Sequence, residues 1–498
     1  MPATPQYDVV VVGAGSAGSV VTRRLVDAGR RVLLLEAGGP DTNPMIHDLS
    51  GMGTLWHGPE DWDYYTVPQE HAADRQLHLP RGKVLGGSHS LNAMIWVRCA
   101  PEDYDGWAAE GNDGWGWDDV RPIYESIESE WLDVSDDYPL VPIQQSIIDA
   151  AVETGLEHNP NYNGDHLDGI SQEQITVRGG ERLSSYRAYL HPIVGNELLT
   201  IETGAWVHRL LIEDGRVVGV EYERDGDIVQ VRAADVVLSA GALDSPRILL
   251  RSGIGPADEL GALGIEVSLD LPGVGKNLHD HLLSPVIFAT RTREIAPPEP
   301  GVSVTQTHLF WKSDPSLAVP DTQPINFSVP MYEPWMEGPA SAFSLMAGLV
   351  TPHSRGSVTL TGADPHDPIA IDLAALRDER DLRSLEASVR QCREIGGASA
   401  LAEGWGAEEL YPGPDVDNDA ALRDYVRRTA ITYHHQVGTC RMGQDARAVV
   451  DERLKVRGIE GLRVIDASIM PTITTGNTNA PAVLIGEQGA RFLLDPTD

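Results

Sequence analysis

The feature that most constrains the fold is a glycine-rich turn between an apolar strand and a helix near the start of the chain. Residues 7–12 (YDVVVV) are apolar after Asp8 and rich in β-branched side chains, which is typical of a buried parallel strand. The segment GAGSAG at 13–18 follows, and a stretch of helical character then runs to about Ala28. A second strand is expected at 31–35, ending at Glu36. This order predicts a βαβ unit that binds a dinucleotide.

Each residue of the turn has a physical role. Gly13 permits the tight turn, Gly15 lets the backbone approach a pyrophosphate, and Gly18 allows the helix to pack closely on the strand. Ser16 and Ala17 lie in the same turn, and the free N–H groups and positive dipole end of the helix that follows favour bound phosphates. The turn is therefore expected to hold the phosphates of the cofactor.

The acidic end of the second strand narrows the choice of cofactor. Glu36, followed by Ala37, should accept a hydrogen bond from a ribose hydroxyl, and its charge would repel a ribose phosphate. An unphosphorylated adenosine, as in FAD or NAD, is thus favoured over NADP. The glycine spacing alone does not choose between FAD and NAD.

The charge balance excludes two classes of partner. The 498 residues include 38 basic and 74 acidic side chains, a formal net charge of −36. Such a chain repels nucleic acid and anionic membranes, so neither is expected as a partner. The longest apolar runs are only strand-length, so no membrane span is expected either. The acidity is expected to serve solubility, and a high-salt habitat stays open as its origin. Lysine is nearly absent and arginine carries most of the positive charge, which fits either the base composition of the source or a salty cytoplasm.

Cysteine usage favours a reducing compartment. Cys99, Cys392 and Cys440 lie far apart without CxxC spacing, which disfavours a disulfide framework and a cysteine-based zinc site. The amino terminus (MPATPQYD) has no basic region and no long apolar stretch, so no secretory signal is expected. We expect a cytoplasmic protein.

No metal site is expected from the sequence. Five histidines have no convincing set of other metal ligands around them in the sequence; they are His57, His71, His78, His279 and His281.

Five motifs extend the pattern over nearly the whole chain. They are PRGKVLGGSHSLNAM at 80–94, SAGALDSPR at 239–247, GVGKNLHDH at 273–281, YHHQVGTCRMG at 433–443, and VIDASIMP at 464–471 with GNTNAP at 476–481. In these motifs the chain resembles the glucose–methanol–choline (GMC) oxidoreductases, which are FAD-dependent. The resemblance implies FAD rather than NAD, and a small-molecule alcohol with an electron acceptor as the partners.

The resemblance also implies further cofactor contacts beyond the first turn. The Gly-Gly-Ser turn brings backbone amides close to a flat ring, and the amide of Asn92 offers it both a donor and an acceptor. By position in the motifs, the remaining contacts are Val84, Gly87, Ser88, Ala93, Met94, Ala240, Gly241, Asp466, Ala467, Asn477 and Thr478. The strand expected at 199–207 also resembles a family segment, which implies that the backbone of Val207 meets the adenine.

The carboxyl-terminal motifs imply the catalytic pair. Oxidation of an alcohol needs a base for the hydroxyl proton while hydride passes to flavin N5, and histidine suits this because its usual pKa is ~6.5. By motif position His435 is the base and Asn479 its partner, which positions the substrate oxygen. His434 is the competing candidate, since it directly precedes His435 and Gln436 replaces the customary proline.

The mode of FAD attachment follows from His89. Some members of the family attach FAD through a histidine directly before the position of Asn92, where this chain has Leu91. His89 is two residues too early, so non-covalent FAD is expected.

The expected fold is α/β plus α+β: a Rossmann-like FAD-binding domain and a substrate domain roofed by a mainly antiparallel sheet. The FAD-binding domain is expected to be discontinuous, at 1–155, 199–285 and 436–498, with the substrate domain at 156–198 and 286–435. Residues 199–207 are expected to form one strand. Residues 303–350 alternate apolar and polar side chains, which predicts antiparallel strands with one wet face, and 378–393 is expected to be helical.

Two other functions compete with alcohol oxidation. The resembled family includes hydroxynitrile lyases and photodecarboxylases, which keep FAD without net alcohol oxidation; His435 and Asn479 argue against this alternative. A Rossmann-type NAD dehydrogenase would require the purified protein to lack FAD.

Overall fold

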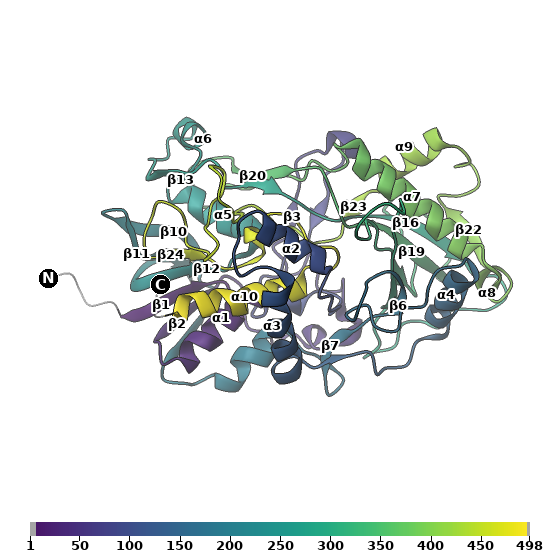
Figure 1. The fold of residues 1–498 in the computed structure, drawn as a ribbon, viewed down its shortest axis with the longest axis horizontal. Helices are drawn as coiled ribbons and strands as arrows, with labels where there is room; N and C mark the ends of the chain where they lie inside the picture. The colour runs from purple at the N-terminus through teal and green to yellow at the C-terminus, as the bar shows by residue number, and fades with distance from the viewer. Residues whose placement is uncertain (1–5, 496–498) are drawn as a thin grey trace.

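The computed structural model describes residues 6–495, and two seven-stranded sheets organise them (Figure 1). The outermost residues of the expected FAD-binding domain, 1–5 and 496–498, lie outside the described residues. Among residues 6–495, no helix is both long and apolar enough to cross a membrane.

The first sheet is the expected Rossmann-like sheet. Its parallel strands lie in the order β9 (Leu199–Thr203), β2 (Val32–Glu36), β1 (Tyr7–Val12), β12 (Asp227–Leu238) and β24 (Leu462–Val464). The antiparallel strands β10 (Trp206–Glu213) and β11 (Arg216–Arg224) extend it from β12. Helices α1 (Ser16–Asp27) and α10 (Asn479–Leu494), from opposite ends of the sequence, pack together beside this sheet (Figure 1).

The glycines of the first turn act as the sequence predicts. Gly13 has a φ of 98°, and a Cβ there would lie 2.4 Å from the carbonyl oxygen of Ser239. A Cβ on Gly18 would lie 1.9 Å from the carbonyl oxygen of Gly13. Only glycine allows this turn and this close packing of α1.

The strand expected at 199–207 is instead two strands. β9 ends at Thr203 and β10 begins at Trp206, in a different part of the sheet. Between them Gly204 takes a φ of 67°, a left-handed conformation that turns the chain out of the strand direction.

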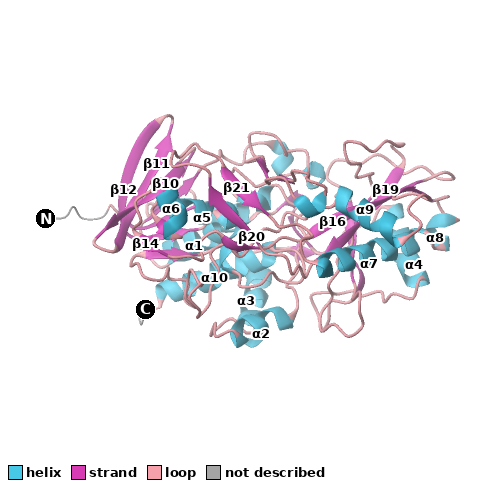
Figure 2. Cartoon of the chain, turned by 90° about the horizontal axis from the view of Figure 1, so that it is seen from above, coloured by secondary structure: helices cyan, strands magenta, loops and turns pink. Residues whose placement is uncertain are grey.

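The second sheet is antiparallel throughout. Its order is β22 (Glu408–Tyr411), β16 (Leu282–Ala289), β19 (Ala342–Leu349), β18 (Ile325–Phe327), β17 (Thr305–Phe310) and β6 (Gly169–Gln172), and β23 (Ile431–Thr432) also pairs with β16. Helix α7 (Glu379–Gly396) packs on β16 and β19, and α4 (Pro142–Glu153) packs on α7 and on β17 (Figure 2).

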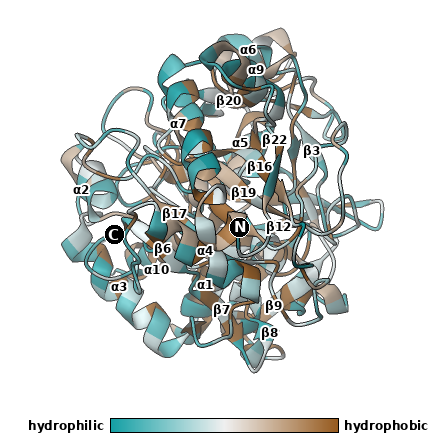
Figure 3. Ribbon diagram, turned by 90° about the vertical axis from the view of Figure 1, so that its right-hand side faces the viewer, coloured by the Kyte–Doolittle hydropathy of each residue, from teal (hydrophilic) through white to brown (hydrophobic). Residues whose placement is uncertain are grey.

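Helix α7 confirms the helix expected at 378–393. Its apolar residues at helical spacing, Leu382, Leu385, Val389 and Cys392, are all buried. Figure 3 shows hydrophilic and hydrophobic stretches along this helix, which is the pattern of an amphipathic helix lying on a sheet.

The expectation of a wet face on the second sheet is wrong. Every residue of β16, β17, β18 and β19 is buried. Helices α4 and α7 cover one side, and on the other side Leu283, Ile325, Phe327 and Met346 line an internal cavity. The polar residues in these strands are therefore bonded inside the protein rather than solvated.

Three expected domain limits do not coincide with the packing. Residue 285 falls inside β16, and α4, expected in the FAD-binding domain, packs on α7, α8 (Ser399–Ala402) and the second sheet. In contrast, the helical turn Tyr186–Leu190 packs against α1. We propose that residues 142–153 and 282–285 belong to the substrate domain, and residues 186–190 to the FAD-binding domain.

Candidate active site

A cavity of about 830 Å³ lies between the two sheets and brings together the motifs of the sequence. The first glycine turn, the Gly-Gly-Ser turn and the last two motifs line it, together with the roof strands of the second sheet. Of the residues predicted to bind the cofactor or substrate, all line the cavity except Gly18, Val84 and Met94.

Gly18, Val84 and Met94 are packed inside the fold rather than on the cavity wall. Gly18 lies under the first turn, as described above. Val84 is buried in a small apolar cluster with Ile46, Leu55 and Leu91. Met94 is fully buried beside Leu49 and Ile175 and has a φ of 64°.

The two glycine turns contact each other, and together they form a surface that a dinucleotide could approach. A Cβ on Gly87 would lie 2.8 Å from Cα of Gly15, so the two backbones meet without side chains between them. Both glycines line the cavity. The flat, amide-rich surface that results is what the pyrophosphate and ring system of FAD require, and the residues fit this cofactor.

Glu36 ends β2 at the wall of the cavity, as expected for a ribose-binding acid. Its two carboxylate oxygens accept hydrogen bonds from the backbone N–H groups of Ala14 (2.9 Å) and Gly38 (2.8 Å). Burial raises the pKa of Glu36 to about 7. The side chain is held rigidly by the turn, and each oxygen keeps acceptor capacity for a ribose hydroxyl.

An aromatic wall that the sequence did not single out lies near Val207. Trp62 and Trp206 both line the cavity, and the guanidinium of Arg247 lies 4.9 Å from the Trp206 ring centroid. Arg247 is also paired with Asp244 at 3.1 Å. Asp244 and Arg247 belong to the SAGALDSPR motif, which could have pointed to this wall, but Trp62 and Trp206 come from loop and strand positions outside the five motifs.

Asn479 lies beside the first glycine turn, whereas the side-chain hydrogen bonds of His435 go to His281 and Asn477. Its Oδ1 accepts a hydrogen bond from Oγ of Ser16 at 2.7 Å, which joins the amino-terminal ends of α10 and α1. Its Nδ2 is buried and has no hydrogen-bond partner among the described residues. Two helix amino termini with a free amide donor between them favour a bound phosphate.

The residue beside His435 is Asn477. The Nδ2 of Asn477 lies 3.3 Å from Nε2 of His435, and its Oδ1 accepts a hydrogen bond from Gln323 at 2.9 Å. Because Gln323 occupies the oxygen, the amide points its N–H toward His435. The Nε2 of His435 therefore acts as an acceptor and is unprotonated.

His281 fixes the other side of the His435 ring. The Nδ1 atoms of the two imidazoles lie 3.0 Å apart. With Nε2 unprotonated, the proton of His435 sits on Nδ1 and is donated to His281. Burial lowers the pKa of His435 well below its usual value, and the neighbouring His281, His434 and Arg81 lower it further. The ring is neutral at physiological pH and can accept a proton at Nε2.

The backbone of His435 is held by Asp280. The carboxylate of Asp280 accepts hydrogen bonds from the backbone N–H of His435 (2.8 Å), from Nε2 of Gln436 (2.5 Å) and from the hydroxyl of Thr432. Burial raises the pKa of Asp280 to about 6. Asp280 and His281 close the GVGKNLHDH motif, which is the signal in the sequence that could have located this support.

His434 is positioned differently from His435. It has a φ of 68°, and its carbonyl oxygen accepts a hydrogen bond from Arg81 at 2.5 Å. Its ring packs edge-on against Trp56, with centroids 5.1 Å apart. Burial, with Arg81 and His78 nearby, lowers the pKa of His434 to about 3.

His89 lies away from the cavity wall. It is fully buried, with Nδ1 3.0 Å from the hydroxyl of Ser185 and Nε2 3.0 Å from that of Thr176. Both ring nitrogens are thus occupied by polar partners within the protein.

The family of this chain follows from its similarity to known proteins. The family model described as GMC oxidoreductase matches residues 7–283, and a second model with the same description matches residues 352–486. The chain belongs to the GMC oxidoreductase family. It is therefore an FAD-dependent oxidoreductase, as the motifs predicted.

Its relatives in this family are similar over their whole length. An alcohol dehydrogenase [acceptor] from Pseudomonas putida is 37% identical, covering 99% of this chain and 96% of that protein. A pyridoxine 4-oxidase from Microbacterium luteolum is 33% identical, with 97% and 98% covered. The crystal structure of pyridoxine 4-oxidase from Mesorbium loti superposes with a TM-score of 0.91 at 34% identity, covering 98% of this chain and 99% of that one.

Proposed function

We propose that the protein oxidises an alcohol in this cavity, with His435 as the general base. The observation that carries the proposal is the contact between Nε2 of His435 and Nδ2 of Asn477 in the cavity that the dinucleotide-binding turns line. Bound FAD supplies the hydride acceptor. His435 takes the hydroxyl proton at Nε2, and the Nδ1–H bond to His281 stabilises the imidazolium that results.

We propose that Asn477, rather than Asn479, is the partner of His435. Nε2 of His435 and Nδ2 of Asn477 are in direct contact at 3.3 Å, so an alcohol hydroxyl would replace that contact. It would donate its proton to Nε2 of His435 and accept a hydrogen bond from the Asn477 amide. Gln323 holds the amide in this orientation. Asn479 then has a separate role, in which Nδ2 donates to the phosphates of FAD.

The substrate side of the cavity favours an uncharged, largely apolar alcohol. Its roof is formed by Ile325, Phe327, Met331 and Met346. Glu333 lies in the same wall but is paired with Arg75 at 3.1 Å, so it offers no unpaired carboxylate to a cationic substrate. An aromatic or aliphatic primary alcohol fits this wall better than a quaternary ammonium alcohol.

An anaerobic alcohol panel tests the proposal. The purified yellow protein is mixed with benzyl alcohol, medium-chain primary alcohols and choline, and flavin absorbance is followed without oxygen. Bleaching by the apolar alcohols, and much less by choline, is the expected result. His435→Ala is the control, which should keep its FAD and fail to bleach. Cyanide release or light-dependent decarboxylation without bleaching by any alcohol would instead support the lyase or photodecarboxylase alternative.

The remaining expectations are proposals on the same basis. FAD is held non-covalently, since His89 is buried between Ser185 and Thr176; acid precipitation should leave the yellow colour in the supernatant. Reoxidation is by oxygen or a quinone-like acceptor, which oxygen uptake during turnover distinguishes. A cytoplasmic location is supported by three cysteines that are all buried and free.

A further inference from the structure

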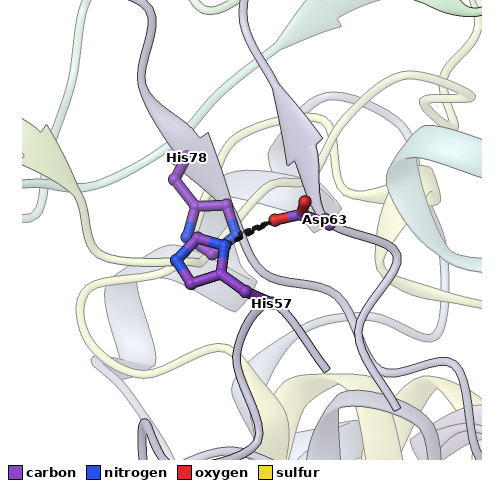
Figure 4. A group of neighbouring side chains, drawn as sticks. All are labelled: His57, Asp63 and His78. Carbon is purple, nitrogen blue, oxygen red and sulfur yellow. Dashed lines mark hydrogen bonds and ion pairs between the residues drawn. The ribbon is translucent and has the colours of Figure 1, made fainter. Parts of the chain in front are cut away.

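Three side chains of the types that bind metal ions converge at the edge of the cavity: His57, Asp63 and His78 (Figure 4). The Oδ1 of Asp63 lies 2.7 Å from Nδ1 of His57 and 3.0 Å from Nε2 of His78. The two imidazoles stack, with centroids 4.0 Å apart and planes inclined by 23°. One nitrogen from each ring and one carboxylate oxygen lie within 4.8 Å of one another.

We propose that His57, Asp63 and His78 bind a divalent transition-metal ion, for which Zn²⁺ is the best match. Two imidazoles and one carboxylate form a common zinc ligand set, with a fourth position left for solvent. Zinc bonds of about 2.0–2.1 Å place tetrahedral ligand atoms about 3.3 Å apart. The separations of 2.7 and 3.0 Å are shorter than this, so the three ligand atoms must move apart slightly to admit the ion.

The backbone holds two of these ligands in an unusual conformation. His57 has a φ of 60° and Asp63 a φ of 54°, in the left-handed region that non-glycine residues seldom adopt. Asp61, between them, accepts hydrogen bonds from the backbone N–H groups of both residues, each at 3.0 Å. The loop is thus built to direct His57 and Asp63 toward the same point.

Asp61 also supports the third ligand. Its Oδ2 lies 3.3 Å from Nε2 of His78, and its side chain is fully buried. It therefore adds a second negative charge beside the three proposed ligands. Because this charge lies beside the proposed ligand nitrogen itself, it favours a cation at that point electrostatically.

A second cluster has the same residue types but a less favourable electrostatic setting. His208 and His366 each place Nε2 near one carboxylate oxygen of Glu223, at 3.4 and 3.2 Å. Burial lowers the pKa of His208, and the charges of Arg247 and Arg251 lower it further, so the same charges would oppose a cation there. The first cluster is the better cation site because Asp61 and Asp63 both contribute negative charge to it.

The position of the first cluster ties metal binding to the cavity. His57 and His78 both line it, and Trp56 lies edge-on to the rings of His78 (6.2 Å) and His434 (5.1 Å). The ion would bind loop residues 57–63 to the hairpin of β3 (Tyr64–Tyr65) and β4 (His78–Leu79). It would thereby fix the wall that Trp56 forms beside His434.

Equilibrium dialysis of the FAD-containing protein tests the site. Protein treated with EDTA is dialysed at about pH 7.5 against Zn²⁺, and bound zinc per chain is measured by atomic emission. His57→Asn and Asp63→Asn remove one ligand each, and asparagine tolerates a positive φ. His366→Asn is the matched control in the second cluster. Flavin absorbance and circular dichroism check that each variant is folded and holds FAD.

The expected result is one Zn²⁺ per wild-type chain, retained in His366→Asn. Affinity should fall by at least about tenfold in His57→Asn and in Asp63→Asn, since even changes to groups that only support a ligand cost about that much. Zn²⁺ should also raise the melting temperature of the wild type but not of these two variants. Absence of stoichiometric zinc in the wild type, unchanged affinity in His57→Asn and Asp63→Asn, or loss in His366→Asn instead would each overturn the proposal.

Discussion

The side-chain amide of Asn477 lies 3.3 Å from Nε2 of His435, whereas Asn479, two residues later, bonds to Ser16. The separation arises at the start of α10. Thr478 precedes the helix and Asn479 is its first residue, so the two asparagines lie on different sides of the point where the chain becomes helical. One amide faces the proposed site of proton transfer and the other faces the end of α1.

Replacing each asparagine by alanine should distinguish the role in turnover from the role in binding FAD. Asn477→Ala removes the donor to the substrate oxygen, and we expect turnover to fall by about 10²–10³-fold, the usual cost of losing one such donor, with FAD retained. Asn479→Ala should instead release FAD more readily and change turnover of the FAD-saturated protein much less. Flavin content after gel filtration and anaerobic reduction rates measure the two effects. The reverse pattern would restore Asn479 as the partner of His435.

The adjacent histidines can be distinguished in the same way. His435→Ala should lower the rate of flavin reduction by about 10²–10⁴-fold, because it removes the general base. His434→Asn should leave most of the rate, since the ring of His434 packs on Trp56 and asparagine accepts its φ of 68°. Stopped-flow reduction at saturating alcohol is the measurement. A greater loss in His434→Asn than in His435→Ala would assign the base to His434.

Local sequence rules were sufficient for the first βαβ unit of the fold. The turn at 13–18 and the acid at the end of β2 depend on spacing within one βαβ unit, so Gly13, Gly15 and Glu36 could be placed from the sequence. Burial on both faces of the second sheet could not be predicted. The cover comes from α4 and α7, which lie far along the chain on either side of β17, β18 and β19.

The directions in which side chains point could not be predicted from the sequence either. Asn477 and Asn479 lie in the same motif at the start of a helix. Only the path of the backbone decides which of them faces His435. Similarly, His57 and His78 are isolated in the sequence. The hairpin of β3 and β4 and the left-handed residues of the preceding loop bring them to Asp63.

The buried His89 should make the protein sensitive to acid. Burial lowers its pKa to about 3 in the folded protein, whereas an unfolded histidine has a pKa of ~6.5. The unfolded state therefore binds the proton more readily. The stability from neutral His89 is fully present above ~6.5 and is lost as pH falls from there toward about 3.

Replacement of His89 by glutamine should flatten this pH dependence. The amide can still bond to Ser185 and Thr176, and we expect the melting temperature of His89→Gln to fall less steeply than that of the wild type between about pH 6.5 and 4. His71→Gln, at a half-buried residue, should keep the wild-type slope. Part of the slope should remain in His89→Gln, because burial also lowers the pKa values of His281 and His308 to about 3. Identical slopes in His89→Gln and the wild type would show that His89 is already protonated in the folded protein.

The net charge of −36 should make folding stability depend on salt. Excess negative charge destabilises the compact state through repulsion, and salt screens it, with a Debye length of about 10 Å at 0.1 M and about 3 Å at 1 M. Salt also weakens surface ion pairs such as Arg232–Glu213, but acidic residues exceed basic ones by nearly two to one, so the repulsion dominates.

We expect the melting temperature to rise with NaCl, and uncharged sucrose at equal osmolality is the control for effects other than screening. A rise that continues to molar salt favours adaptation to a salty cytoplasm, whereas a plateau near 0.2 M favours acidity that serves solubility alone. A melting temperature that falls with NaCl would show that the ion pairs outweigh the repulsion.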